Sequence, residues 1–278
     1  FHPGYQQVRR IETIAVEHGD NDWIYTDNGA DIVFGGSAED WIRANNVDSD
    51  NKDQDVILGD NGAATFLSGG SENSVEIPTW ISSQSPEIGG DDIIFSGRGP
   101  DIVIGGQGND DINAGDANQD NLSFHDDSRD LVLGDNGFID LDNHGNIEYA
   151  SSIATSIGGD DIISTGGGSD VVFGGYGSDT INTSGIPADT RDRDVVLGDS
   201  GEATFDSLTY ILRDIRTLTD SIGDADQIET AFDADIVFGG IGSDYIVTYS
   251  DNDNDDGSRD IVAGDNGYAL FDELENIE

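Results

Sequence analysis

The sequence contains no cysteine and no methionine, and it has few basic residues. Without cysteine, no disulfide can cross-link the fold in any redox compartment. No run of about 18 apolar residues occurs, so a membrane-spanning helix is excluded. Only 11 lysines and arginines stand against 58 acidic residues, so no basic patch is available for nucleic acid. Neither end resembles a signal peptide, and because residue 1 is Phe1 we expect a processed or excised segment.

The sequence is instead rich in acidic residues and glycine. The formal net charge is −47, and a compact chain with that charge repels itself unless cations neutralise it. An acidic disordered chain is the simplest alternative. We reject it because the aliphatic residues recur at fixed spacings, and because the 38 glycines lie at repeat positions, where they mark turns.

The recurring element is a triplet of aspartates spaced nine residues apart. In the clearest copy, GGDDIISTGGGSDVVFGGYGSDTI at 158–181, each aspartate follows glycines and precedes isoleucine or another β-branched residue. The triplets are Asp22, Asp31 and Asp40; Asp92, Asp101 and Asp110; Asp161, Asp170 and Asp179; and Asp226, Asp235 and Asp244. This period predicts short strands joined by tight Gly-rich turns and wound into a parallel sheet.

The nine-residue unit resembles the Gly-Gly-x-Gly-x-Asp-x-Ile-x repeat of RTX, or haemolysin-type, calcium-binding β-roll proteins. The best local matches are GGQGNDDIN at 105–113 and GGYGSDTIN at 174–182. The resemblance implies an all-β fold, a parallel β-roll or β-solenoid, that binds several Ca²⁺ ions at its Gly/Asp turns.

A longer repeat of 65–70 residues contains each triplet, as the middle aspartates at 31, 101, 170 and 235 show. We predict one continuous array with approximate repeats 11–80, 81–149, 150–214 and 215–278. In each repeat a variable insert follows the triplet, and a fourth aspartate then opens a motif with GDNG or GDSG at its centre. These fourth aspartates are Asp55, Asp130, Asp194 and Asp260, and those of the GDNG or GDSG turns are Asp60, Asp135, Asp199 and Asp265.

We count about six short strands in each long repeat. Three follow the triplet aspartates, one follows the fourth aspartate, one follows the GDNG turn and one lies in the connector to the next repeat. If all are half-coils, the chain has about twelve coils and a length of about 55–60 Å. We expect Val33, Val103, Val172 and Val237 to point inward and to stack along the axis.

Calcium takes roughly six to eight oxygen ligands, and Gly-rich turns leave their backbone carbonyls uncovered. In the family that the sequence resembles, the ion lies between stacked turns. The resemblance therefore implies the pairs Asp22–Asp40, Asp92–Asp110, Asp161–Asp179 and Asp226–Asp244 on one edge of the roll, and Asp31–Asp55, Asp101–Asp130, Asp170–Asp194 and Asp235–Asp260 on the other. The inserts make the second edge depart from the family pattern. The alternative, in which the aspartates only cap turns, leaves stacked carboxylates without a cation, at a high cost.

The GDNG aspartates have two readings. Asn-Gly favours a tight turn with positive φ, and the same aspartates could also bind calcium. The acidic insert DNDNDDG at 251–257 is superficially similar to an EF-hand loop, but it lacks the terminal glutamate. We expect a solvated acidic loop there, with at most weak cation binding.

Nothing in the sequence indicates catalysis, and we do not expect an enzyme. The GDSG at 198–201 occupies the position of GDNG in the other repeats, so Ser200 replaces a turn asparagine. The four histidines share no spacing, and we expect them on the surface. They are His2, His18, His125 and His144.

The two ends of the sequence lie inside a repeat. Residues 11–24 align with residues 215–228 without a gap, and the last residues stop where another connector would begin. We therefore expect either a segment of a longer array or subunits that stack head to tail into a filament, because an open strand edge invites pairing.

The sequence predicts a secreted, calcium-stabilised structural protein at the cell surface. It would be a repeat segment of a giant surface protein, an adhesin stalk or a filament subunit. Two alternatives stay open. One is a module that binds carbohydrate or protein through Trp23, Trp41 and Trp80. The other is the secretion module of a larger secreted enzyme or toxin.

Overall fold

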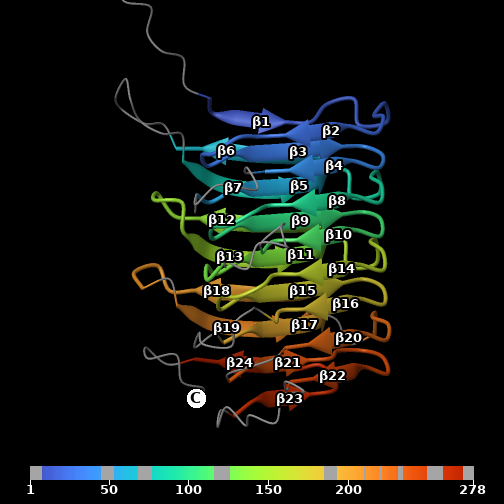
Figure 1. Cartoon of the computed structure of the whole chain (residues 1–278), viewed down its shortest axis with the longest axis vertical. Coiled ribbons are helices and arrows are strands. Elements are labelled where there is room, and N and C mark those ends of the chain that lie inside the picture. Colours follow the sequence, from blue (N-terminus) through green and yellow to red (C-terminus); the bar gives the residue numbers. More distant parts are fainter. Residues whose placement is uncertain are drawn as a thin grey trace, which may run out of the picture.

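The structure is a computed structural model that describes residues 8–44, 53–67, 77–115, 126–184, 193–209, 211–218, 221–230, 234–248 and 259–271. In these residues it contains only strands, turns and loops, arranged in three eight-stranded sheets that run the length of the molecule (Figure 1). Within the same ranges there is no helix able to cross a membrane.

Two of the sheets are parallel and form the roll, and the third is antiparallel. The outer sheet contains β2 (Trp23–Tyr25), β4 (Trp41–Arg43), β8 (Ile93–Phe95), β10 (Asp111–Asn113), β14 (Ile162–Ser164), β16 (Thr180–Asn182), β20 (Gln227–Glu229) and β22 (Tyr245–Val247). The middle sheet contains β3 (Ile32–Gly36), β5 (Val56–Asp60), β9 (Ile102–Gly106), β11 (Leu131–Asp135), β15 (Val171–Gly175), β17 (Val195–Asp199), β21 (Ile236–Phe238) and β23 (Ile261–Ala263). The antiparallel sheet contains β1 (Arg10–Glu12), β6 (Gly62–Phe66), β7 (Pro78–Ser83), β12 (Gly137–Leu141), β13 (Ile147–Ser152), β18 (Gly201–Phe205), β19 (Leu212–Thr217) and β24 (Tyr268–Leu270).

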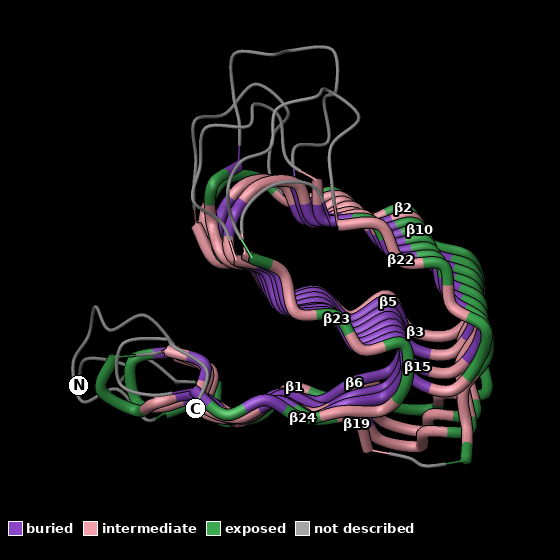
Figure 2. Tube along the Cα trace, turned by 90° about the horizontal axis from the view of Figure 1, so that it is seen from below, coloured by how far each residue is buried: buried purple, intermediate pink, exposed green. Residues whose placement is uncertain are grey.

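The middle sheet is covered on both faces, which explains its unbroken aliphatic triplets. In β5, Ile57 belongs to the core between the middle and outer sheets, whereas Val56 and Leu58 belong to the core against the antiparallel sheet. Parallel strands buried on both faces typically read as continuous Val, Ile and Leu runs rather than as alternating patterns. Figure 2 shows the three layers end on, with the buried residues concentrated in the middle one.

The outer strands from β4 to β20 bury only their central residue, and the central residues of β2 and β22 are partly buried. Ile42, Ile112 and Ile181 point into the roll, and the residues on either side of each face outward. The predicted inward valines are confirmed, because Val33, Val103, Val172 and Val237 all lie in this same core. Aligned registers stack them on one another, for example Val33 opposite Ile57 and Ile57 opposite Val103.

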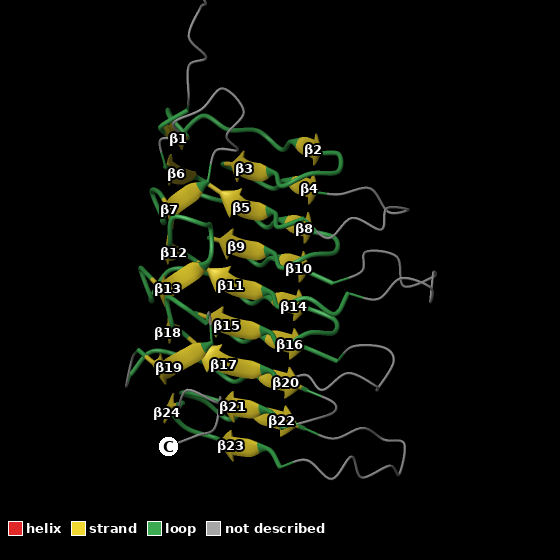
Figure 3. Ribbon diagram, turned by 90° about the vertical axis from the view of Figure 1, so that its left-hand side faces the viewer, coloured by secondary structure: helices red, strands yellow, loops and turns green. Residues whose placement is uncertain are grey.

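The prediction that all six strands of a repeat wind into coils is wrong. β5 ends at Asp60 and β6 begins at Gly62, so no room is left for a Gly-rich turn and the chain leaves the roll. β6 then pairs antiparallel with β7, and the chain returns to the outer sheet at β8 (Figure 3). Each long repeat therefore adds two coils. Within the described residues each parallel sheet has eight strands, so this part of the roll has eight coils, and at about 4.8 Å per strand it is about 40 Å long.

Candidate calcium-binding edges

Each edge of the roll carries a column of aspartates, and each aspartate lies directly before a strand. Along a column, the backbone N–H of one aspartate donates to Oδ1 of the next, with N···O distances of 2.7–3.3 Å. The first edge, where the chain enters the outer sheet, carries Asp22, Asp40, Asp92, Asp110, Asp161, Asp179, Asp226 and Asp244. The second edge carries Asp31, Asp55, Asp101, Asp130, Asp170, Asp194, Asp235 and Asp260.

All the predicted aspartate pairs are neighbours in these columns. The same hydrogen bond also joins successive repeats, as when the N–H of Asp40 donates to Asp92 over 2.7 Å. The columns are therefore continuous from the first described coil to the last. Stacking brings like charges together at every step, so each edge needs a source of positive charge.

The second oxygen of many column carboxylates is buried and accepts no hydrogen bond within the described residues. These Oδ2 atoms belong to Asp31, Asp40, Asp92, Asp101, Asp110, Asp130, Asp161, Asp179, Asp226 and Asp244. On the first edge they point toward glycine carbonyls. A methyl group built on Gly134 would lie 2.2 Å from Oδ2 of Asp161 and 2.3 Å from the carbonyl oxygen of Gly174.

Carboxylate and carbonyl oxygens thus converge on a space that only glycine leaves open. No three acidic or histidine side chains come together at one point in the parts of the chain that the structure describes. A bound ion would therefore be held by carboxylates from neighbouring coils together with backbone carbonyls. Calcium accepts such a mixed set of oxygen ligands, and the residues present fit it.

Burial strongly disfavours the charged form of these carboxylates when no cation is near. Burial, followed by the charges of Asp110 and Asp60, raises the pKa of Asp92 to about 9. The pKa of Asp226 is likewise raised to about 9, first by burial and then by Asp179 and Asp199. Charged carboxylates in these positions would be unfavourable in a metal-free fold, and a divalent cation removes the penalty.

Acidification should favour folding of the chain when calcium is absent. In the unfolded chain aspartate has a pKa of about 3.9, whereas burial raises the pKa of Asp110 to about 7 and that of Asp92 to about 9. Between about pH 4 and about pH 9 the folded form therefore binds more protons than the unfolded form. The stability of the fold rises as the pH falls through this range. Circular dichroism in a chelator should show strand structure increasing from pH 8 to pH 5.5.

With saturating calcium the pH dependence should reverse, because protons then compete with the ion for the same oxygens. Loss of strand signal on acidification in chelator as well would contradict this assignment of the buried carboxylates.

The GDNG aspartates accept hydrogen bonds where the chain leaves the roll and where it returns. Asp60 lies opposite Gly36 in the parallel register, so a carboxylate replaces the second glycine of the direct turn. Its Oδ1 accepts the N–H of Gly90 at 3.1 Å in the returning segment, and its Oδ2 accepts the N–H of Gln107. The same contacts recur at Asp135 with Gly159 and Tyr176, and at Asp199 with Ile241.

Asp265 is exposed, because the described residues contain no coil beyond it. A calcium role for these four aspartates stays a prediction. The predicted positive φ of the Asn-Gly turns is wrong, since positive φ values occur elsewhere among the described residues, for example at Gly36 and Gly106. A methyl group on Gly62 would lie 2.4 Å from Cδ2 of Leu58, so a larger residue there would require that buried side chain to move.

Asp126 is a site residue that the sequence patterns did not indicate. Its side chain is buried, and Oδ2 accepts the N–H of Gly99 at 3.1 Å in the neighbouring turn of the second edge. Its position four residues before Asp130 was hidden among the acidic residues of a variable insert. The insert at 251–257, with its predicted weak cation binding, lies outside the described residues, as do His2 and His125.

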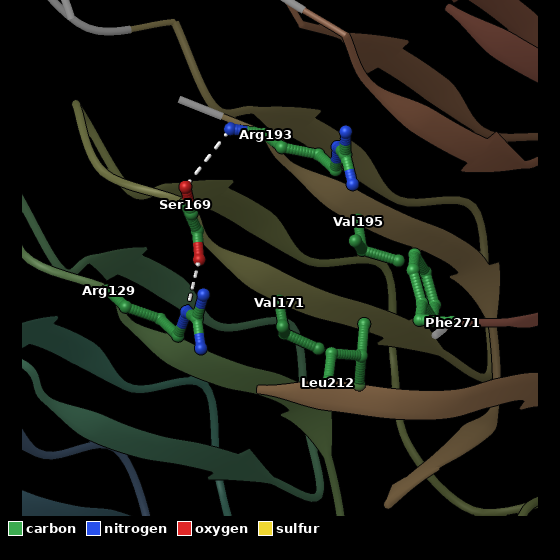
Figure 4. A pocket seen from close by; sticks show the side chains of 7 residues that line it. All are labelled: Arg129, Ser169, Val171, Arg193, Val195, Leu212 and Phe271. Carbon is green, nitrogen blue, oxygen red and sulfur yellow. Dashed lines mark hydrogen bonds between the residues drawn. The ribbon is translucent and has the colours of Figure 1, made fainter. Parts of the chain in front are cut away.

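A small groove between the middle and antiparallel sheets lies next to the second edge (Figure 4). Its lining residues are Arg129, Ser169, Val171, Arg193, Val195, Leu212 and Phe271. Nε of Arg129 donates to the carbonyl of Ser169, and the backbone N–H of Arg193 donates to its hydroxyl, both at 3.0 Å. Each arginine directly precedes a column aspartate. The groove therefore contains two of the few basic residues of the chain.

The remaining residues singled out by sequence lie outside the two edges. His18 and His144 are exposed, as expected. Ser200 is buried in the same turn position as Asn61 and Asn136. The ring of Trp23 stacks on that of Trp41 with 5.5 Å between centroids. Trp80 lies on the antiparallel sheet, 5.8 Å below the guanidinium of Arg10.

The fold and its two aspartate columns define a calcium-binding parallel β-roll. The family profile of the RTX calcium-binding nonapeptide repeat matches the chain in four copies, at residues 18–46, 88–118, 156–185 and 222–255. The chain therefore contains RTX calcium-binding nonapeptide repeats in these four segments, and each match contains one aspartate triplet. The GDNG motifs and the strands of the antiparallel sheet lie outside the matched segments. No curated protein and no solved structure matches the chain.

Proposed function

We propose that this chain is a calcium-stabilised structural rod of a secreted protein, a repeat segment of a large surface protein or adhesin stalk. The observation that carries the proposal is the continuous column of buried carboxylates whose Oδ2 atoms face the glycine carbonyls of neighbouring coils. A net charge of −47 adds a second reason for the fold to depend on cations.

In this proposal, calcium binding and folding are one event. Where calcium is scarce, as in a cytosol, the acidic chain stays unfolded and can be exported. Where calcium is millimolar, as outside cells, ion binding supplies the free energy that holds the coils together. The role is mechanical rather than catalytic, and the buried carboxylates serve as ligands rather than as acid or base groups.

A calcium titration followed by circular dichroism tests the proposal. In chelator at pH 8 the chain should lack strand signal, and the signal should appear cooperatively as calcium is added. Magnesium at the same concentration is the control and should be much less effective, because Mg²⁺ is smaller and gives up its water reluctantly. A spectrum that is the same in chelator and in calcium would remove the proposed function.

A carbohydrate- or protein-binding module is the second candidate, with the exposed Trp23 as its candidate stacking residue. The stacking of Trp23 on Trp41, at an interplanar angle of 20°, covers one face of each ring and favours packing over sugar binding. A glycan array without hits would count against this candidate. The reading frame of the intact gene would show whether the roll serves instead as the secretion module of a larger enzyme or toxin.

A further inference from the structure

The two edges of the roll differ in the residue that begins each turn. This residue lies two positions after each valine or isoleucine that packs between the middle and outer sheets. At the first edge it is always glycine, at Gly35, Gly59, Gly105, Gly134, Gly174, Gly198 and Gly239. At the second edge it is alanine, serine or threonine, at Thr26, Ala44, Ser96, Ala114, Thr165, Thr183, Thr230 and Thr248.

At the first edge, the missing side chain leaves the space in which the candidate calcium ligands meet. A methyl group on Gly105 would lie 2.4 Å from Oδ2 of Asp110 and 2.1 Å from the carbonyl oxygen of Gly134 in the next coil. The other six glycines have the same two neighbours, a column carboxylate and the carbonyl of the next coil. A side chain in this position would therefore occupy the place of the ion.

At the second edge, hydroxyl groups bind the corresponding two kinds of oxygen. Oγ1 of Thr183 donates to Oδ2 of Asp194, the column aspartate that ends the same turn, at 2.5 Å. Oγ of Ser96 donates at 3.2 Å to the carbonyl of Ala114, which holds the equivalent position in the next coil. Each hydroxyl thus satisfies an oxygen of the kind that faces an open space at the first edge.

Alanine at this position extends the apolar core to the second edge. Ala44 and Ala114 are buried and belong to the core between the middle and outer sheets. Calcium takes roughly six to eight oxygen ligands, and a methyl group offers none. The second edge therefore lacks the open, oxygen-lined space that the glycines leave at the first edge.

Arginines lie in the turns of the second edge. Arg129, Arg193 and Arg259 each directly precede a column aspartate, and a fourth arginine, Arg98, lies in another turn of the same edge. Nε of Arg129 donates to the carbonyl of Ser169 at 3.0 Å and so joins two neighbouring turns (Figure 4). Because a guanidinium group is always charged, the chain itself supplies positive charge to this edge.

The corresponding segments of the first edge contain no lysine or arginine. These segments are 35–40, 84–92, 105–110, 153–161, 174–179, 221–226 and 239–244. The stacked carboxylates in them can be neutralised only by cations from solution or by protons. The two edges therefore obtain their positive charge from different sources.

We propose that calcium binds along the first edge alone, and that the chain's own Ser/Thr hydroxyls and arginines join the turns of the second edge. The inference rests on the calcium-stabilised roll of the proposed function, and it assigns the ions to one of the two candidate columns. It departs from the nonapeptide pattern, which implies ions at both edges.

Asp110→Asn at the first edge and Asp194→Asn at the second edge form a matched pair. Both aspartates are buried, and each accepts a backbone N–H along its column, from Asp92 at 2.8 Å and from Asp170 at 3.0 Å. An amide oxygen can accept the same N–H. In the second variant the amide nitrogen can also donate to Oγ1 of Thr183.

The two readouts are the calcium midpoint of strand formation at pH 8, from circular dichroism, and the number of calcium ions bound at saturation, from equilibrium dialysis. Asp110→Asn should raise the midpoint by at least about tenfold and should bind fewer ions than the unaltered chain. Asp194→Asn should bind as many ions as the unaltered chain, with a midpoint that is no higher.

Loss of bound ions in Asp194→Asn would overturn the assignment to one edge, and so would an unchanged ion count in Asp110→Asn. If Asp194→Asn does not fold in calcium, the ion count of Asp130→Asn decides, since its amide oxygen can accept the N–H of Asp101. A chain that folds equally in chelator and in calcium removes the proposed function itself, which separates that failure from failure of the one-edge assignment.

Discussion

Gly134→Ala should prevent the central coils from folding at calcium concentrations that fold the unaltered chain. The added methyl group would lie 2.2 Å from Oδ2 of Asp161 and 2.3 Å from the carbonyl oxygen of Gly174. The carbonyl belongs to the backbone of a buried strand and cannot rotate away. Forcing extra volume into such a packed site costs about 1–3 kcal/mol or more, and here it also displaces two candidate calcium ligands.

The measurement is the calcium midpoint of strand formation, read by circular dichroism on dilute samples. Gly264→Ala is the matched control, because Gly264 has the same place in the fourth GDNG motif but open space around it. We expect the midpoint to rise by at least about tenfold for Gly134→Ala and to stay unchanged for Gly264→Ala. Equal midpoints for the two variants would mean that the space beside Gly134 is not part of a site.

The roll could be predicted from sequence because one short motif determines the turn, the start of the next strand and the side of that strand that faces the core. In GGYGSDTIN the glycines fix the turn, Asp179 fixes where the strand begins, and Ile181 fixes which side faces the core. A period of nine residues then brings each turn back one coil later. For this reason the predicted aspartate pairs correspond to hydrogen-bonded neighbours such as Asp161 and Asp179.

The antiparallel sheet could not be predicted in the same way. The strand after each GDNG turn has an ordinary alternating pattern, and that pattern fits a third parallel coil as well as a hairpin. The outcome depends on the single residue between Asp60 and Gly62, which leaves too little chain for a Gly-rich turn. Small residues such as Ala64 and Ala150 then let the hairpins pack closely on the middle sheet.

The role of the GDNG aspartates depends on contacts between distant segments. The partners of Asp60 are Gly90 and Gln107, which follow it by 30 and 47 residues. Neither spacing belongs to the nine-residue period or to the long repeat. Asp126 could not be predicted for a related reason. Its partner Gly99 is distant in the sequence, and no local motif distinguishes Asp126 from the other acidic residues of its insert.

Asp161→Asn should have opposite effects on the metal-free and calcium-bound forms of the chain. The amide keeps an oxygen that can accept the N–H of Asp110, a bond of 2.8 Å in the present structure. It also removes the negative charge of the Asp161 carboxylate, whose pKa is raised by burial and by the neighbouring carboxylates of Asp110, Asp135 and Asp179. In chelator the variant should therefore be at least as folded as the unaltered chain.

In calcium the same substitution should weaken folding, because the ion loses a charged ligand. Residues that only support a metal ligand are worth about 10–100-fold in affinity, so the loss of a ligand should raise the calcium midpoint by at least about tenfold. Asp111→Asn is the control, since Asp111 points outward from the outer sheet nearby. It removes the same charge from the surface and should leave the midpoint nearly unchanged.

The opposite signs distinguish a calcium ligand from a turn cap. A cap works through its hydrogen bond alone, and an amide oxygen preserves that bond, so a purely capping Asp161 predicts the same gain in calcium as in chelator. A ligand predicts the same gain in chelator together with a loss in calcium. The difference between the two measured effects isolates what the negative charge contributes to holding the ion, because the hydrogen bond to Asp110 is common to both conditions.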